Sequence, residues 1–135
     1  MILFHFTKPE HLPAILMLGL RPLGKFDDML GHGRFGVWLL DSPTKEIPAR
    51  AKAILQERGQ WEDQEWLPGC IARLRINIPS HDPAHRKLFR YLPWLRKNGP
   101  WEGSPIVDDE LSAAAMEAYW VYFGVIKPKF IQVCT

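Results

Sequence analysis

Prolines are the feature of this sequence that most constrains its fold, because twelve of them are spread through 135 residues. Proline lacks an amide hydrogen and fixes φ, so it interrupts helices and the interior strands of sheets. The prolines therefore predict many short elements. The apolar fraction of 47% is ordinary and allows a full core to form. Six tryptophans supply large apolar side chains, either for that core or for a groove that stacks a planar ligand.

Strand-like segments recur along the chain, and each is short and rich in β-forming residues. The five segments expected to form strands are Ile2–Phe6, Val37–Leu40, Cys70–Ile78, Tyr119–Val125 and Phe130–Val133. The alternation is clearest in the third segment, where Leu74 and Ile76 face one way and Arg73 and Arg75 face the other. This pattern predicts a sheet with one buried face.

Helical spacing appears between the strand-like segments. Thr7 and Glu10 form a Thr-x-x-Glu capping box, Pro13 is expected to open the regular part of the first helix, and Gly19 is expected to end it. The three later helices are expected from Ser42 and Pro43 to about Arg58, over Lys87–Arg96 and over Leu111–Met116.

The order of these elements favours an α+β fold with a mainly antiparallel sheet, because strands and helices mix without strict β-α-β alternation. A chain of 135 residues has the size of one domain, which is expected to span residues 1–135. The residues expected to be buried in its core are Leu16, Val37, Leu74, Ile76, Val121 and Phe123.

The location of the protein is expected to be cytoplasmic. No stretch approaches the roughly 20 apolar residues that span a bilayer, and the first residues lack the pattern of a cleaved signal peptide. The net charge of +2 does not suggest a dedicated nucleic-acid binder. The two cysteines, Cys70 and Cys134, form no CxxC pair and are expected to be buried free thiols.

Two motifs invite a functional interpretation that their context does not support. His81 and His85 have the i, i+4 spacing of helical zinc sites, but Pro83 lies between them and no third ligand is evident. A solvated turn without metal is expected there. Residues 31–36 match GxGxxG, yet a strand follows the motif where a dinucleotide fingerprint needs a helix. The loop retains Arg34, whose guanidinium suits a bidentate contact with phosphate.

The segment LFHFTKPEHLPAILMLGLRP resembles the opening of the ADP-ribosyltransferase-like superfamily. It is especially similar to the small bacterial and phage members and to the DNA-targeting ADP-ribosyltransferase toxins. The matching positions are His5, Phe6, Thr7, His11, Leu12, Pro13, Ile15, Leu16, Gly19 and Leu20. GRFGVWLLDSP, with Arg34 and Trp38, resembles the family's next loop and strand. AYWVYFGVIKPKFIQV resembles its penultimate strand, Ile-x-Pro turn and closing strand.

The resemblance implies a split, strongly bent β-core that grips NAD as co-substrate in a cleft. It assigns NAD contact to His5, Phe6, Thr7, Arg34 and Trp38, with Arg34 at the pyrophosphate and Trp38 at the nicotinamide or ribose. Glu117 is the first candidate for the catalytic carboxylate, and Glu110 is the reserve. This carboxylate would stabilise the positive charge that develops on the ribose as nicotinamide leaves.

The function implied by the resemblance is mono-ADP-ribosyltransferase activity toward a macromolecular acceptor, either protein or nucleic acid. A non-enzymatic inhibitor or protein-binding module on the same fold is the main alternative, because aromatic anchors commonly dominate protein interfaces. RNA 2′-phosphotransferase activity is a weaker alternative, for which Arg34, Arg73 and Arg75 would supply cleft arginines.

Overall fold

A computed structural model describes residues 1–22, 36–42, 48–61, 72–98, 113–114 and 116–134 of the chain. The strands are β1 (Ile2–Thr7), β2 (Val37–Leu40), β3 (Ala72–Asn77), β4 (Leu88–Arg90), β5 (Tyr119–Tyr122) and β6 (Ile131–Cys134). The helices are α1 (Leu12–Leu18), α2 (Ala49–Glu57) and α3 (Tyr91–Asn98), with short 3-10 helices η1 (Pro9–His11), η3 (Pro83–Lys87) and η4 (Pro128–Phe130).

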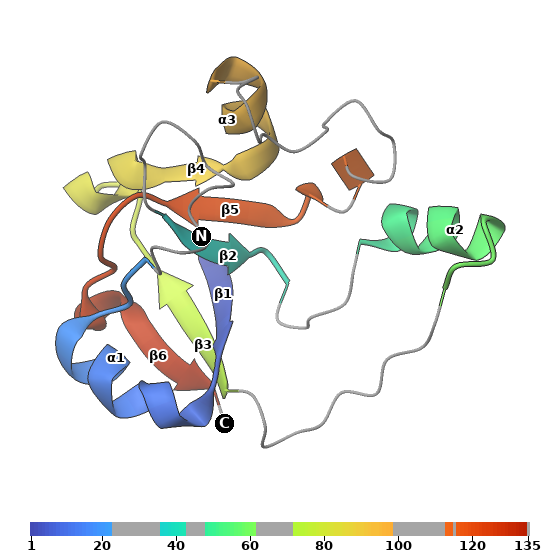
Figure 1. The fold of residues 1–135 in the computed structure, drawn as a ribbon. Coiled ribbons are helices and arrows are strands. Elements are labelled where there is room, and N and C mark those ends of the chain that lie inside the picture. Colours follow the sequence, from blue (N-terminus) through green and yellow to red (C-terminus); the bar gives the residue numbers. More distant parts are fainter. Residues whose placement is uncertain (23–35, 43–47, 62–71, 99–112, 115, 135) are drawn as a thin grey trace.

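The six strands form one sheet in the order β4-β5-β2-β1-β3-β6, and its pairings are antiparallel. This arrangement with short helices confirms the predicted α+β class. Six residue pairs join β1 to β3, but a single pair, Phe4 with Leu40, joins β1 to β2. The sheet therefore consists of two three-stranded halves that meet at one point. Figure 1 shows the strands of the two halves running in clearly different directions.

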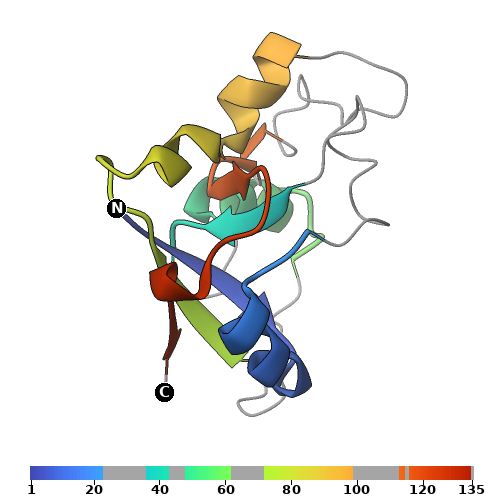
Figure 2. The same cartoon turned by 90° about the vertical axis from the view of Figure 1, so that its left-hand side faces the viewer.

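Two of the hydrophobic clusters lie against the sheet. The larger contains Leu3, Leu74 and Ile76 from the strands, together with Ile15 of α1 and Phe130 of η4. Figures 1 and 2 show α1 beside the half formed by β1, β3 and β6. The second cluster lies where α3 packs on β5 and contains Tyr91, Trp94, Leu95 and Val121, with Trp38 and Phe123 partly buried against them. The larger cluster also contains Val37 and Leu39 of β2, Leu88 of β4 and Tyr122 of β5, so it packs against both halves of the sheet, whereas the second cluster is local to α3 and β5.

Most of the predicted strands and core positions are confirmed. The alternation in β3 is correct, because Leu74 and Ile76 are buried in the larger cluster. Val37 and Val121 are also buried, and Phe123 is half-buried. Cys134 is a half-buried free thiol, whereas Cys70 lies outside the described residues.

Of the three predictions about the ends of the first helix, one is wrong and two are confirmed. The capping box is wrong, because Lys8 precedes η1 and no side chain caps either η1 or α1. Thr7 pairs with Ala72 in the sheet, which holds it in an extended conformation. Pro13 lies in the first turn of α1 as expected, and Gly19 ends the helix.

Three further differences concern helices. Residues 88–90, expected to be helical, form β4 because Leu88 pairs with Tyr122 across the sheet. Helix α2 begins at Ala49 after Pro48, and Ser42 is not helical, while residues 43–47 lie outside the described part. Leu16 is exposed, because α1 turns Ile15 toward the sheet instead. Of the segment 111–116, residues 113, 114 and 116 are described, and they are helical.

Gly19 is required where the chain leaves α1. Its φ of 95° and ψ of 170° lie in a region that is essentially restricted to glycine. An added Cβ would stand 2.5 Å from the main-chain oxygen of Ile126. This close approach allows Leu20 and Ile126 to exchange two backbone hydrogen bonds of 2.9 Å. Gly19 therefore ties the end of α1 to the segment that leads into η4.

Candidate functional site

A cleft opens where β1 and β2 separate beyond the Phe4–Leu40 pair. It encloses about 370 Å³. His5 and Thr7 line it from β1, and Gly36, Val37 and Trp38 line it from the β2 side. Helix α1 and residues 19–22 complete the described wall. The cleft thus exists because the two halves of the sheet share only one residue pair.

The His5 side chain bridges the two strands at the edge of this cleft. Its Nδ1 lies 2.7 Å from the main-chain oxygen of Trp38. A carbonyl oxygen can only accept a hydrogen bond, so Nδ1 must carry the hydrogen. In the neutral imidazole the other nitrogen, Nε2, is then a hydrogen-bond acceptor. The contact fixes the tautomer and holds the ring where β1 and β2 diverge.

The Trp38 ring is held by two tyrosines in edge-to-face contact. Its centroid lies 4.5 Å from that of Tyr91 and 5.8 Å from that of Tyr119. Contacts of this kind contribute about 0.5–1.5 kcal/mol beyond the area they bury. Burial raises the pKa of Tyr91 to about 12, so this phenol is neutral at physiological pH. Trp38 is therefore a rigid wall residue, fixed through both its ring and its main-chain oxygen.

The polar side chains that line the cleft come from His5, Thr7, His11 and Arg21. The sequence identifies His11 only as part of the resembled motif and does not single out Arg21 as a site residue. Arg21 is exposed and follows Leu20, whose bridge to Ile126 sets the path of the chain. The predicted end of the helix at Gly19 is the sequence signal that lies next to Arg21. Among the described residues, no aspartate or glutamate lines the cleft.

The remaining predicted site residues do not join His5, Thr7 and Trp38 in the described wall. Phe6 is half-buried on β1, where alternation turns it to the face opposite His5. Glu117 is exposed on the turn before β5. That turn is tied to the end of β2, because the Asp41 amide donates to the Ala118 oxygen over 3.1 Å. Arg34 and Glu110 lie outside the described residues.

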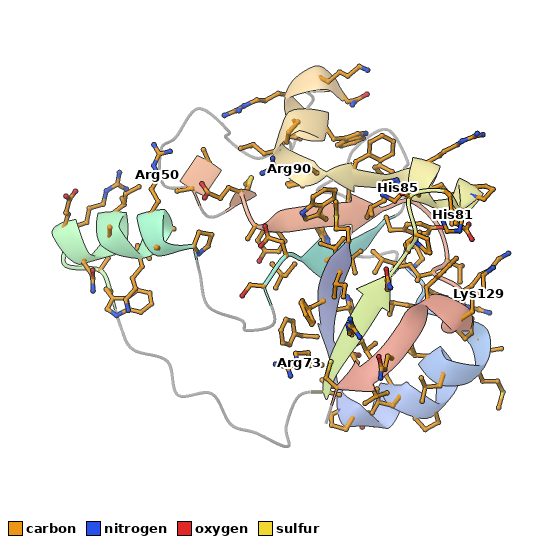
Figure 3. The ribbon with its side chains drawn as sticks, turned by 180° about the vertical axis from the view of Figure 1, so that it is seen from behind. Arg50, Arg73, His81, His85, Arg90 and Lys129 are labelled. Atoms are coloured by element: carbon orange, nitrogen blue, oxygen red, sulfur yellow. The ribbon has the colours of Figure 1, made fainter. Side chains whose placement is uncertain are left out.

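Two other groups of side chains contain the residue types of metal or phosphate sites. His81 and His85 lie at the η3 turn with Lys129 nearby (Figure 3), and His81 is exposed. The described residues contain no group of three or more His, Cys, Asp or Glu side chains that would hold a metal ion. Arg50, Arg73 and Arg90 lie on separate parts of the molecule in Figure 3 and do not converge.

Comparisons with protein-family models, with curated proteins and with solved structures found no match. In the part of the chain that the structure describes, no helix has the length and apolar character needed to cross a membrane. The interpretation of the cleft therefore depends on its own residues and on the sequence resemblance.

Proposed function

We propose that the protein is a mono-ADP-ribosyltransferase that binds NAD in the cleft between β1 and β2. The observation that carries this proposal is the 2.7 Å contact between His5 Nδ1 and the Trp38 oxygen. It stands at the point where the sheet opens, and His5, Thr7 and Trp38 line the same cleft. The sequence resemblance assigns NAD contact to these three residues.

The size and lining of the cleft suit part of a dinucleotide. Its volume of about 370 Å³ falls within the range of small-molecule sites, roughly 300–1,000 Å³. The His5 ring and the Thr7 hydroxyl carry polar atoms of the kind that bind ribose hydroxyls. Trp38 supplies a flat apolar surface for nicotinamide, and Arg21 adds a guanidinium suited to the diphosphate.

The arrangement of the sheet also supports the proposal. The resembled family has a split, strongly bent β-core, and here two three-stranded halves meet only at Phe4 and Leu40. A ligand that enters between β1 and β2 displaces no strand pairing, because the register of the two strands contains just that pair.

The proposed reaction breaks the glycosidic bond between the nicotinamide nitrogen and C1′ of the ribose. Nicotinamide leaves with the bonding electron pair, and an acceptor nucleophile forms a bond to C1′ and loses a proton. Orientation of NAD by His5, Thr7 and Trp38 would supply the entropic part of catalysis. A carboxylate near C1′ would stabilise the cationic transition state.

Glu117 is proposed to supply this carboxylate. In its favour, it lies two residues before Tyr119, whose ring contacts Trp38 at a centroid distance of 5.8 Å. The turn that carries Glu117 is therefore anchored to a wall residue of the cleft. Glu110 remains the reserve candidate.

One observation favours the alternative of a non-enzymatic binding module on this fold. Among the described residues, no acidic side chain lines the cleft, whereas a transferase would require one there. The RNA 2′-phosphotransferase alternative gains no support, because Arg73 and Arg75 are not among the residues that line it.

Incubation with two forms of labelled NAD tests the proposal. Label in the adenylate portion should pass to a macromolecule, while label in the nicotinamide should appear as free nicotinamide. Saturable NAD binding without either change would favour the binding module. The absence of both binding and nicotinamide release would contradict the proposal.

A further inference from the structure

Helix α1 is apolar on the side that faces solvent. Its sequence is Leu-Pro-Ala-Ile-Leu-Met-Leu, and Ile15 is its one buried residue. The exposed fractions are 45% for Leu16, 77% for Met17 and 53% for Leu18. A surface helix normally presents polar side chains to water, and contiguous exposed apolar side chains mark interaction sites.

This apolar region extends beyond the helix. The side chain of Val125, which is 44% exposed, lies against Gly19 at the end of α1, within 2.9 Å of an idealised Cβ there. Leu16, Met17, Leu18 and Val125 are together called the α1 surface. Leu18 also lines the cleft, so the α1 surface is continuous with the mouth of the candidate site. A molecule bound on this surface would therefore lie next to the cleft.

The residues that flank the α1 surface along the chain, called its rim, are mainly basic. Lys8 precedes η1, Arg21 follows Leu20, and Lys127 follows Ile126, which bridges to Leu20. All three are exposed. Glu10 is the one acidic residue in the segments 8–22 and 125–127 that carry this surface and its rim. Apolar side chains within a cationic rim are complementary to an apolar patch flanked by carboxylates.

We propose that the α1 surface docks a protein partner that presents apolar side chains flanked by acidic residues. Under the proposed function, on which this step rests, that partner is the ADP-ribose acceptor. Nucleic acid fits less well, because its affinity comes mainly from phosphate neutralisation and α1 itself carries no cationic side chain. A second copy of this chain also fits less well, because pairing two α1 surfaces would bring two basic rims together.

An acidic amphipathic peptide tests the docking chemistry without NAD. The probe is a fluorescein-labelled peptide of about 15 residues, with Leu at helical spacing and Glu at the other positions. Fluorescence anisotropy should show saturable binding that weakens as salt rises from about 0.05 to about 0.5 M. Met17→Glu should weaken binding at least about tenfold. Phe89→Glu is the matched control, because Phe89 is 38% exposed on β4, outside the α1 surface, and this change should leave affinity unaltered.

Several results would overturn the proposal. These are no binding by the wild type, equal loss with Phe89→Glu, or unchanged affinity with Met17→Glu. Tighter Met17-dependent binding of an oligothymidylate or of phosphatidylglycerol vesicles would assign the surface to nucleic acid or membrane instead. Self-association that Met17→Glu abolishes in light scattering would assign it to a second copy. Peptide binding by a protein that neither binds nor cleaves NAD would retain the docking surface and reject the transferase.

Discussion

His5 and Trp38 lie where β1 and β2 have separated beyond the Phe4–Leu40 pair, yet the His5 side chain joins the two strands through a 2.7 Å contact to the Trp38 main-chain oxygen. The contact links the two halves of the sheet at the edge of the cleft. Because Trp38 also contacts Tyr91 and Tyr119, the cleft wall is coupled to α3 and to the start of β5. Substitutions at these residues should therefore show which contacts stabilise the fold and which contribute to ligand binding.

Gly19→Ala should destabilise the protein by at least about 1–3 kcal/mol, because glycine-only backbone strain is joined by a steric clash. The new Cβ would meet the Ile126 oxygen, which is main chain and cannot move independently. Gly59→Ala is the control, since Gly59 also has positive φ but has no atom within 4 Å of its added Cβ. Urea titration should show the larger loss for Gly19→Ala. Equal losses of unfolding free energy in the two variants would mean that the contact with Ile126 adds nothing to the effect of Gly19→Ala.

Ile76→Ala should lower the free energy of unfolding by roughly 2–5 kcal/mol, through lost apolar burial and the cavity left behind. Ile76 is 1% exposed on β3, within the larger hydrophobic cluster. Val125→Ala, at an exposed position, should change stability by no more than about 0.5 kcal/mol. A loss below that value for Ile76→Ala, measured by denaturant titration, would show that the buried face of β3 is misassigned.

Stability should fall in alkali partly because of Tyr91. Burial raises its pKa from 10.0 to about 12, so between these pH values the folded state retains a proton that the unfolded state releases. The contribution is fully present below pH 10 and is lost as pH rises toward 12, by up to about 2–3 kcal/mol. Tyr91→Phe should show a smaller alkaline loss than the wild type.

Tyr119→Phe controls for the Tyr91 experiment, because Tyr119 also contacts Trp38 but lies at the surface. It should follow the wild-type pH dependence of the unfolding midpoint. If Tyr91→Phe also follows it, alkaline unfolding does not involve ionisation of the buried phenol.

Glu117→Gln should abolish ADP-ribose transfer and leave NAD affinity within a few-fold. The substitution keeps the size of the side chain but removes the charge that is proposed to act on the transition state. Loss of a preorganised electrostatic group typically costs on the order of 10²–10³ in rate. The comparison is with Glu110→Gln in the same transfer assay. Full activity in both variants would exclude a catalytic carboxylate at either position.

Local patterns predicted much of the sheet. The alternation around Leu74 and Ile76 identifies β3 and its buried face, since a strand repeats every two residues. Local patterns failed where a distant partner decides the structure. Leu88 has helical spacing with Leu92 and Leu95, yet pairing with Tyr122 places it in a strand. Leu16 is expected inside, but Ile15 faces the core, and the next residue of a helix is turned about 100° away from it.

The candidate site was predictable only in part. The His5–Phe6–Thr7 motif led to the cleft, and alternation then separates Phe6 from the other two residues. Arg21 was missed because its place in the wall depends on the bridge between Leu20 and Ile126, which are far apart in sequence. The position of Glu117 relative to the cleft likewise depends on the pairing of β5 with β2, which no local pattern specifies.

Calorimetric titration with NAD tests the central claim most directly. The wild type should bind NAD saturably, and His5→Ala should weaken binding at least tenfold, about 1.4 kcal/mol, because both the proposed ribose contact and the support of Trp38 are lost. His81 is an exposed histidine at the η3 turn, so His81→Ala should bind NAD with the affinity of the wild type. Absence of heat and of any thermal shift at millimolar NAD would contradict the account, as would equal affinity in the wild type and His5→Ala.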